Sequence, residues 1–270
     1  MVAYEEVRGL PQPKRMLPGY VALESVGSLL PGATSDIREA RLRSGLKVNT
    51  PGKPYAVANE YIAARIGSAT GLPIPPGGIV QVQRHPSSNG PKIGYVCLLF
   101  QPEGDSLPPI IPSRLVAADP HLCMGAILFD MWIRNGIDRH EENLGWLEGF
   151  GGVLFDHDAA LLGFRKGEAV AELANAKDQP SLDGHCLAGE LRTLEDAYEW
   201  AGRFEAVPNA LIRESAETVF RLGLITAPER DAVVEFLVFR QRRLLAYLER
   251  SERLFGKVQA WPLIDEAGDV

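Results

Sequence analysis

Three side chains within residues 132–162 have types and spacing that suit phosphoryl transfer. Asp138 and Asn143 are five residues apart, and Asp156 follows 13 residues after Asn143. Phosphoryl transfer needs a carboxylate to orient the attacking hydroxyl and accept its proton, and hard oxygen ligands to hold Mg²⁺ against the phosphates. Asp138 fits the first role, whereas Asn143 and Asp156 fit the second. The alternative interpretation is a polar turn in a helical protein.

Asp138 is predicted to lie on a loop directly after a buried helix. The apolar residues before it follow a helical spacing: Leu115, Val116, Leu122, Ile127, Leu128, Met131 and Trp132. This pattern stops at Asn135-Gly136, which suits the end of a helix because glycine tolerates the left-handed backbone conformation there. We therefore expect this helix to position the loop that carries Asp138.

A hairpin is predicted to bring the metal-ligand candidates together. The apolar runs Leu144–Leu147 and Val153–Phe155 are separated by a glycine-rich turn, which is a hairpin signal. Asn143 then lies at one foot of the hairpin and Asp156 at the other. Asp158 is either a second metal ligand or the cap of a helix in the run after it. Asp156 is favoured as the main ligand because it directly follows the apolar strand.

A lysine and a glutamate upstream are candidates for binding nucleotide phosphates. Lys47 lies in the predicted strand Leu46–Val48, and Glu60 lies 13 residues later in a helix predicted over Tyr55–Thr70. Kinases use a strand lysine to reach the phosphates and pair it with a glutamate of the next helix. The alternative is a solvated lysine and a glutamate that stabilises the first helical turn. Lys53 is a rival for the phosphate role, although its Pro-Gly neighbourhood indicates a loop.

Two further segments are candidates for contacts with a nucleotide. Thr34 and Ser35 lie in a turn of small residues, which lets backbone N–H groups approach phosphate oxygens closely. A plain surface turn is the alternative. Backbone groups near Leu99 and Gln101, where a strand runs into a Pro-Gly connector, would hydrogen-bond adenine. An edge strand followed by a loop is the alternative there.

The chain as a whole is predicted to divide into a strand-rich part and a helix-rich part. Strand-like runs precede Pro102: Tyr20–Leu30 (a strand or short helix), Ile37–Leu42, Ile79–Val82 and Ile93–Phe100. Residues 164–186 are polar and are expected to form a flexible loop near the acceptor site. Helices are predicted over 187–206, 208–222 and 226–254. Arginines on the last helix indicate a solvated face or, alternatively, a binding surface: Arg240, Arg242, Arg243 and Arg250.

Composition restricts the class of protein. The chain has 270 residues, of which 46% are hydrophobic and 23% charged, as in an ordinary globular protein with an ample core. A net charge of −7 argues against nonspecific nucleic-acid binding, which needs a basic surface. Because the three cysteines are widely spaced and no apolar signal segment is seen, we expect reduced thiols and a cytoplasmic location. No run of about 18 apolar residues exists, so no membrane span is expected.

Three segments together resemble the HipA-like kinase family of bacteria. They are KVNTPGKPYAVANEYIAARIGSATGLPIP, FDMWIRNGIDRHEENLGW and GGVLFDHDAALL. The similarity runs from about residue 30 to 250 and is greater to the compact branch that lacks the long N-terminal subdomain of the HipA toxins. The order Asp-Arg-His-x-x-Asn also resembles phosphoinositide kinases locally, whereas protein kinases have His-Arg-Asp.

The resemblance implies roles for four residues. Asp138 would be the catalytic base, and Lys47 the lysine that binds nucleotide phosphates. Asn143 and Asp156 would be the metal ligands. Two departures concern the phosphate region: the stretch before Lys47 is less glycine-rich than a typical kinase loop, and Asp158 stands where related motifs often have glycine.

We therefore expect an α+β, two-lobed protein-kinase-like fold. A small mixed β/α N-terminal lobe would span residues 1–101, and a mainly helical C-terminal lobe residues 102–270, with ATP and Mg²⁺ between them. The expected activity is transfer of the ATP γ-phosphate to a serine or threonine hydroxyl of a protein. The alternatives are a small-molecule or lipid head-group acceptor, or a nucleotide-binding pseudokinase that acts as an interaction module. Neither a nucleic-acid partner nor a membrane span is expected.

Overall fold

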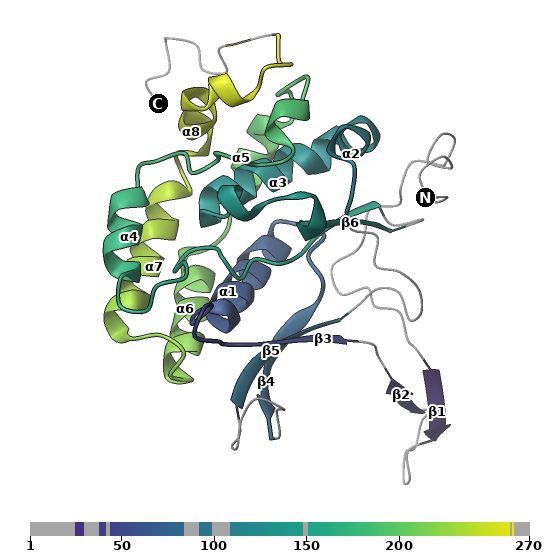
Figure 1. The fold of residues 1–270 in the computed structure, drawn as a ribbon, viewed down its shortest axis with the longest axis vertical. Helices are drawn as coiled ribbons and strands as arrows, with labels where there is room; N and C mark the ends of the chain where they lie inside the picture. Colours follow the sequence, from purple (N-terminus) through teal and green to yellow (C-terminus); the bar gives the residue numbers. More distant parts are fainter. Residues whose placement is uncertain are drawn as a thin grey trace.

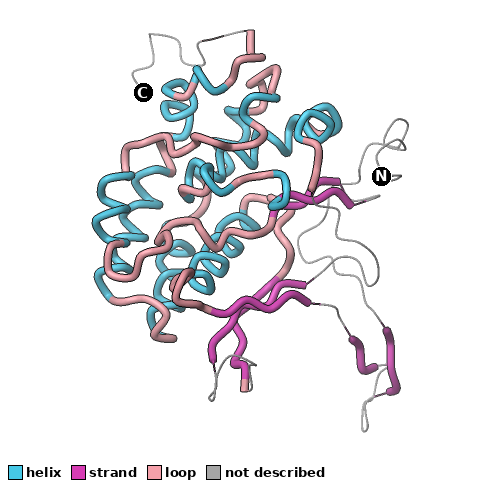
Figure 2. The backbone as a smooth tube through the Cα atoms, in the orientation of Figure 1, coloured by secondary structure: helices cyan, strands magenta, loops and turns pink. Residues whose placement is uncertain are grey.

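The computed structural model describes residues 25–29, 38–41, 44–83, 92–98, 109–147, 151–259 and 261. Its strands gather on one side of the molecule, and helices make up most of the other side (Figure 1 and Figure 2). The fold is therefore mixed α+β, as predicted. The predicted boundary between the lobes, at residues 101 and 102, lies outside the described residues.

The N-terminal part contains a three-stranded antiparallel sheet and a separate pair of strands. In the sheet, β5 (Lys92–Leu98) lies between β3 (Ser44–Val48) and β4 (Gly77–Val82). In the pair, β1 (Ser25–Leu29) runs antiparallel to β2 (Arg38–Arg41). All five strands overlap the runs that the sequence predicts to be extended.

Helix α1 (Ala56–Ala69) packs against the three-stranded sheet and also against the C-terminal helix α6. It confirms the helix predicted over Tyr55–Thr70. Gly67 allows close packing, because a Cβ at this position would lie 2.4 Å from the side chain of Ile74. The helix ends before Gly71, whose left-handed φ of 85° is one that glycine adopts readily. The position of α1 thus depends on both parts of the molecule.

The C-terminal part is mainly helical and surrounds helix α3 (Pro120–Ile133). Every residue of α3 from Leu122 to Ile133 is buried, so this helix is the centre of the core. The hairpin of β6 (Leu144–Leu147) and β7 (Gly151–Leu154) follows α3 along the chain. The other helices are α2 (Pro112–Ala118), α4 (Ala169–Ala176), α5 (Ala197–Glu205), α6 (Asn209–Arg221), α7 (Ala227–Arg240) and α8 (Leu244–Arg250).

A sharp bend divides the helical pattern predicted before Asp138, so that Leu115 and Val116 belong to α2 and the later residues to α3. Asp119 forms the junction, and its side chain caps α3 by accepting a hydrogen bond of 2.9 Å from the backbone N–H of Leu122. Pro120 occupies the first turn, where its missing N–H costs nothing. No single helix in the described part of the chain is long and apolar enough to cross a membrane. Taken together α2 and α3 pass on length and composition alone, but the bend between them is 119°.

Two predictions for the C-terminal part are wrong, and the helix predicted over 187–206 is confirmed only over α5. The helix predicted over 226–254 is interrupted between α7 and α8. Gln241 stabilises this break, because its side-chain amide donates to the carbonyls of Phe204 and Val207 near the end of α5. The flexible loop predicted over 164–186 contains α4, which packs against α7. In both segments long-range contacts decided the local structure.

Arg240 corrects a third prediction, because it is fully buried rather than solvated. Its guanidinium donates to the carbonyl of Met131 near the end of α3 and to that of Ala176 at the end of α4. Further acceptors are the carbonyls of Lys177, Gln179 and Pro180. Burial lowers the pKa of Arg240 to about 10. This side chain thus links three helices, whereas the remaining predicted arginines are exposed: Arg242, Arg243 and Arg250.

We expect Arg240→Met to lower the free energy of unfolding by about 3 kcal/mol or more. Methionine fills part of the same space, but the carbonyls that accept from the guanidinium all lose that donor, including the buried one of Met131. Urea denaturation of the purified variant measures the change. The matched control is Arg242→Met, whose arginine side chain is 72% exposed, and this variant should shift stability by less than about 0.5 kcal/mol. Similar losses in the two variants would contradict the structural role of Arg240.

Candidate active site

The loop that carries Asp138 begins where α3 ends, and it includes the short 3-10 helix Gly136–Asp138. Arg134 has the left-handed conformation that closes the helix, with a φ of 59°. The expectation that the stop at Asn135-Gly136 rests on a left-handed glycine is therefore wrong. Gly136 serves close packing instead, because a Cβ there would lie 2.4 Å from the carbonyl oxygen of Ser181. The loop is held tightly against the segment that follows α4.

Arg139, which follows Asp138, organises the site from inside the core. Its guanidinium pairs with Asp130 of α3, with Nε–Oδ2 and Nη2–Oδ1 distances of 2.7 and 3.1 Å. Nη1 of Arg139 also donates to the carbonyls of Asn143 and Phe155, at 2.6 and 2.8 Å. Burial raises the pKa of Asp130, but Arg139 and His185 outweigh it and hold that pKa well below its usual value. One buried ion pair therefore fixes both feet of the hairpin to α3.

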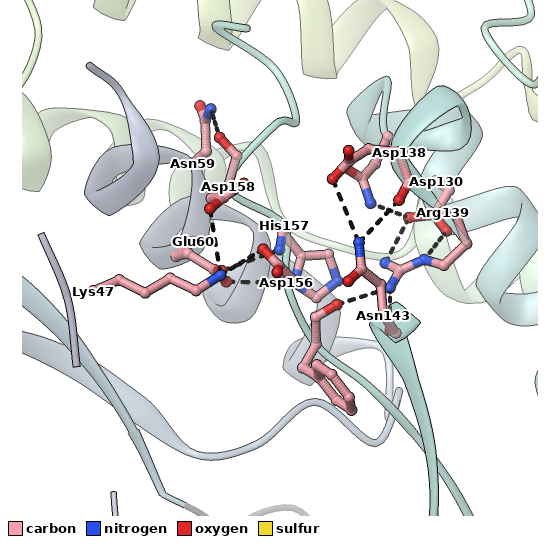
Figure 3. Close-up of polar contacts among 12 residues, drawn as sticks. Lys47, Asn59, Glu60, Asp130, Asp138, Arg139, Asn143, Asp156, His157 and Asp158 are labelled. Carbon is pink, nitrogen blue, oxygen red and sulfur yellow. Dashed lines mark hydrogen bonds and ion pairs between the residues drawn. The ribbon is translucent and has the colours of Figure 1, made fainter. Parts of the chain in front are cut away.

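Asp138 and Asn143 are brought together, as their spacing predicts (Figure 3). Nδ2 of Asn143 lies 2.9 Å from the carbonyl oxygen of Asp138 and 3.4 Å from its carboxylate. Burial raises the pKa of Asp138, and the charges of Asp156 and Asp158 raise it further. A carboxylate with a raised pKa is a stronger proton acceptor. The geometry therefore suits Asp138 to accept a proton.

The predicted hairpin is confirmed and places Asn143 at one foot and Asp156 at the other. Leu144 pairs with Leu154 at the base of the hairpin, and the backbone N–H of Phe155 lies 3.4 Å from the carbonyl of Asn143. Asp156 has a φ of 58°, a left-handed conformation that aspartate tolerates better than most residues. This backbone turn directs the chain from the hairpin toward α1.

Lys47 and Glu60 form an ion pair that also includes Asp156 (Figure 3). Nζ of Lys47 lies 2.5 Å from a carboxylate oxygen of each acid. The same oxygen of Glu60 accepts a hydrogen bond of 3.1 Å from the backbone N–H of His157. The alternative interpretation of Glu60 as a first-turn residue is wrong, because it is the fifth residue of α1 and is buried. The pair thus joins β3, α1 and the segment after the hairpin.

The Glu60 network predicts loss of stability in acid. Burial raises the pKa of Glu60, but the contacts with His157 and Lys47 outweigh it and lower that pKa to about 2 from the ordinary 4.5. A carboxyl with a lowered folded-state pKa stabilises the protein above pH 4.5, and this stabilisation is lost as pH falls toward 2. We expect Glu60→Gln to remove a contribution of the order of 3 kcal/mol from the pH dependence.

Urea denaturation at several values between pH 7 and pH 2 measures this contribution. The matched control is Glu195→Gln on an exposed residue, which should retain the pH dependence of the unmodified chain. The prediction is contradicted if Glu60→Gln and the unmodified chain lose stability in parallel as the pH falls.

Asp158 is buried and paired with Lys53, which the sequence indicated only as a rival of Lys47 for the phosphate role. Nζ of Lys53 lies 2.7 and 2.8 Å from the two carboxylate oxygens of Asp158. The backbone carbonyl of Asp158 accepts a hydrogen bond of 2.8 Å from Asn59 of α1. The helix-cap alternative for Asp158 is wrong, because the described residues directly after it form turns. Its position beside the Lys47 network keeps it a metal-ligand candidate.

Other predicted contacts with a nucleotide lie outside the described residues. These are Thr34 and Ser35 of the small-residue turn, and Leu99 and Gln101 of the connector. They stay predictions. The residues that the structure brings together are Lys47, Glu60, Asp138, Asn143, Asp156 and Asp158.

The order and packing of the elements identify the class of fold. A small antiparallel sheet with one packed helix, followed by a mainly helical part that carries a polar loop and hairpin, is the fold of a kinase. A solved structure supports this assignment: the chain is similar to a Helicobacter pylori proinflammatory kinase, CtkA, with a TM-score of 0.54. The identity is 13%, and the match covers 85% of this chain and 96% of that chain. At this identity the likeness establishes the fold.

Sequence comparison adds no assignment: no protein-family model matches the chain, and no curated protein matches it.

Proposed function

We propose that the protein is an ATP-dependent kinase of the HipA-like type, which transfers the γ-phosphate to a hydroxyl acceptor. The observation that carries the proposal is the contact of Lys47 with both Glu60 and Asp156, within a kinase fold. Asp138 and Asn143 lie on the adjoining loop. This set contains the lysine–glutamate pair, the base and the oxygen ligands that phosphoryl transfer needs.

The donor set fits Mg²⁺. The candidate ligands are the carboxylates of Asp156 and Asp158 and the amide of Asn143, and hard oxygen donors are what Mg²⁺ prefers. Because the amide nitrogen of Asn143 donates to Asp138, the side-chain oxygen of Asn143 is the atom suited to a metal. Bound ATP supplies the phosphoryl group, and Mg²⁺ offsets the charge of the phosphates.

The residues of this chain would position and deprotonate the acceptor. Asp138 orients the attacking hydroxyl and accepts its proton at a carboxylate oxygen, a role favoured by its raised pKa. Lys47 is held by Glu60 in an orientation suited to phosphate oxygens. Arg139 holds the carbonyls of Asn143 and Phe155, which fixes the backbone next to the proposed ligands Asn143 and Asp156.

We further propose a serine or threonine hydroxyl of a protein as the acceptor. Ile137, directly before Asp138, is 75% exposed, although the residues around it are largely buried. This exposed isoleucine beside the proposed base offers an apolar contact to a polypeptide acceptor. We also propose that the protein acts in the cytoplasm and has no nucleic-acid partner, as the sequence leads us to expect.

The test is incubation of the purified protein with Mg²⁺ and γ-labelled ATP, alone and with a cell lysate, followed by mass spectrometry. Label on a serine or threonine of a protein is the expected result. Label on a lipid or small molecule would replace the acceptor but keep the kinase. Absence of both nucleotide binding and turnover would overturn the proposed function, and binding without turnover would indicate a pseudokinase.

A further inference from the structure

Lys53 lies on a tight, well-anchored turn between β3 and α1. The backbone N–H groups of Thr50 and Lys53 each donate to the carbonyl of the other residue, at 3.2 and 3.1 Å. The hydroxyl of Thr50 also accepts from the N–H of Lys53 at 3.1 Å. Asn49 fastens the turn to α1 by accepting a hydrogen bond of 2.9 Å from the N–H of Val57. The backbone of Lys53 is thus fixed, while its long side chain extends from it.

The ammonium group of Lys53 lies against Asp158 from the solvent side. It contacts both carboxylate oxygens, and its side chain is 44% exposed against 6% for that of Asp158. Nζ of Lys47 lies 3.5 Å from Oδ2 of the same carboxylate. Asp158 is therefore close to a lysine of the ion-pair network and to a second, more exposed lysine.

The two lysines are held differently. Lys47 contacts Glu60 and Asp156 at once, and its side chain is 31% exposed. The contacts that the described residues give Lys53 Nζ are with Asp158 alone. If Mg²⁺ binds Asp158, the carboxylate charge is offset by the metal and Lys53 loses its counterion. A lysine on a fixed turn would then lie next to a metal that carries phosphate groups.

We propose that Lys53 is a second phosphate-binding lysine, which pairs with Asp158 in the free protein and turns to the terminal phosphate of the nucleotide when Mg²⁺ takes Asp158. The inference rests on the proposed function and adds a residue to it. The exchange changes no covalent bond, because the ammonium group of Lys53 only leaves a carboxylate partner for a phosphate partner. The side chain of Lys53 is exposed enough to move without disturbing the core.

A simpler role for Lys53 makes the opposite prediction. If Lys53 only neutralises the buried Asp158, its removal leaves an unpaired carboxylate beside Asp156. Mg²⁺ alone would then bind more tightly, and the preference for a triphosphate over a diphosphate would not change. The two roles are therefore separated by binding measurements that do not depend on turnover.

The experiment compares Lys53→Met with the unmodified chain by isothermal titration with Mg²⁺ and either ADP or a non-hydrolysable ATP analogue. We expect the variant to bind the triphosphate analogue about tenfold or more weakly and ADP within about twofold of normal, because a charged hydrogen bond is lost only at the terminal phosphate. The matched control is Lys257→Met, an exposed lysine paired with Glu190, which should leave both affinities unchanged. Lys53→Arg should restore most of the loss.

Each other outcome is decisive. Equal affinities for the triphosphate analogue in Lys53→Met and the unmodified chain, while the unmodified chain binds it with Mg²⁺, would overturn the role of Lys53 and leave the proposed function standing. Equal weakening toward ADP and the triphosphate would also overturn it. An unmodified chain that binds neither nucleotide would overturn both proposals.

Discussion

Asp138→Asn is expected to abolish phosphoryl transfer while leaving the fold and nucleotide binding intact. Asparagine keeps the shape of the side chain but cannot accept the proton of the attacking hydroxyl, and a positioned base contributes about 10²–10⁴-fold to the rate. The shorter contact from Asn143, of 2.9 Å, goes to the backbone carbonyl of Asp138, which the substitution retains. The loop should therefore hold its structure. Turnover of γ-labelled ATP and titration with Mg²⁺ and nucleotide measure the two effects separately.

The control for this prediction is Asp183→Asn. Asp183 also lies between helices, but it is exposed and is paired with Arg253. This variant should keep both turnover and binding. Near-normal turnover in Asp138→Asn would show that another group accepts the proton, and loss of binding in that variant would assign Asp138 to the metal instead.

Local patterns in the sequence predicted the elements that position the site. The apolar spacing before Asn135-Gly136 identified the buried helix α3, and the glycine-rich turn after Leu147 identified the hairpin. The five-residue spacing of Asp138 and Asn143 placed them in contact. Such features depend on neighbours a few residues away along the chain, which is the range that periodicity and turn residues report.

Contacts between distant segments could not be predicted in the same way. The apolar helix before the loop contains a single acid, Asp130, and that isolated charge was a signal of the buried pair with Arg139. Arg240 gave no such signal, because its acceptors are backbone carbonyls and any residue supplies those. For Lys53, the sequence placed it correctly on a loop but contained no sign that Asp158 would lie opposite.

The second large effect is expected at Asp156. Asp156→Asn should weaken Mg²⁺-dependent nucleotide binding by about 100-fold, and Asp158→Asn by about tenfold, because loss of a charged ligand costs more where that ligand directly faces the metal. Asp156 directly follows the hairpin strand that ends beside Asn143, and one of its oxygens contacts Lys47, whereas both oxygens of Asp158 are paired with Lys53 in the free protein. Asparagine is the informative replacement, since it tolerates the left-handed φ of 58° at residue 156.

Titration of nucleotide at several Mg²⁺ concentrations separates the metal contribution from the rest. Removing the charge at residue 156 also takes one partner from Lys47, but Glu60 retains the lysine, so that binding without Mg²⁺ should change little. Equal losses in the two variants would indicate two metal ions shared by both acids. A greater loss in Asp158→Asn would reverse the assignment and make Asp158 the main ligand. If Asp156→Asn weakens nucleotide binding equally with and without Mg²⁺, the substitution acts through Lys47 instead of through the metal.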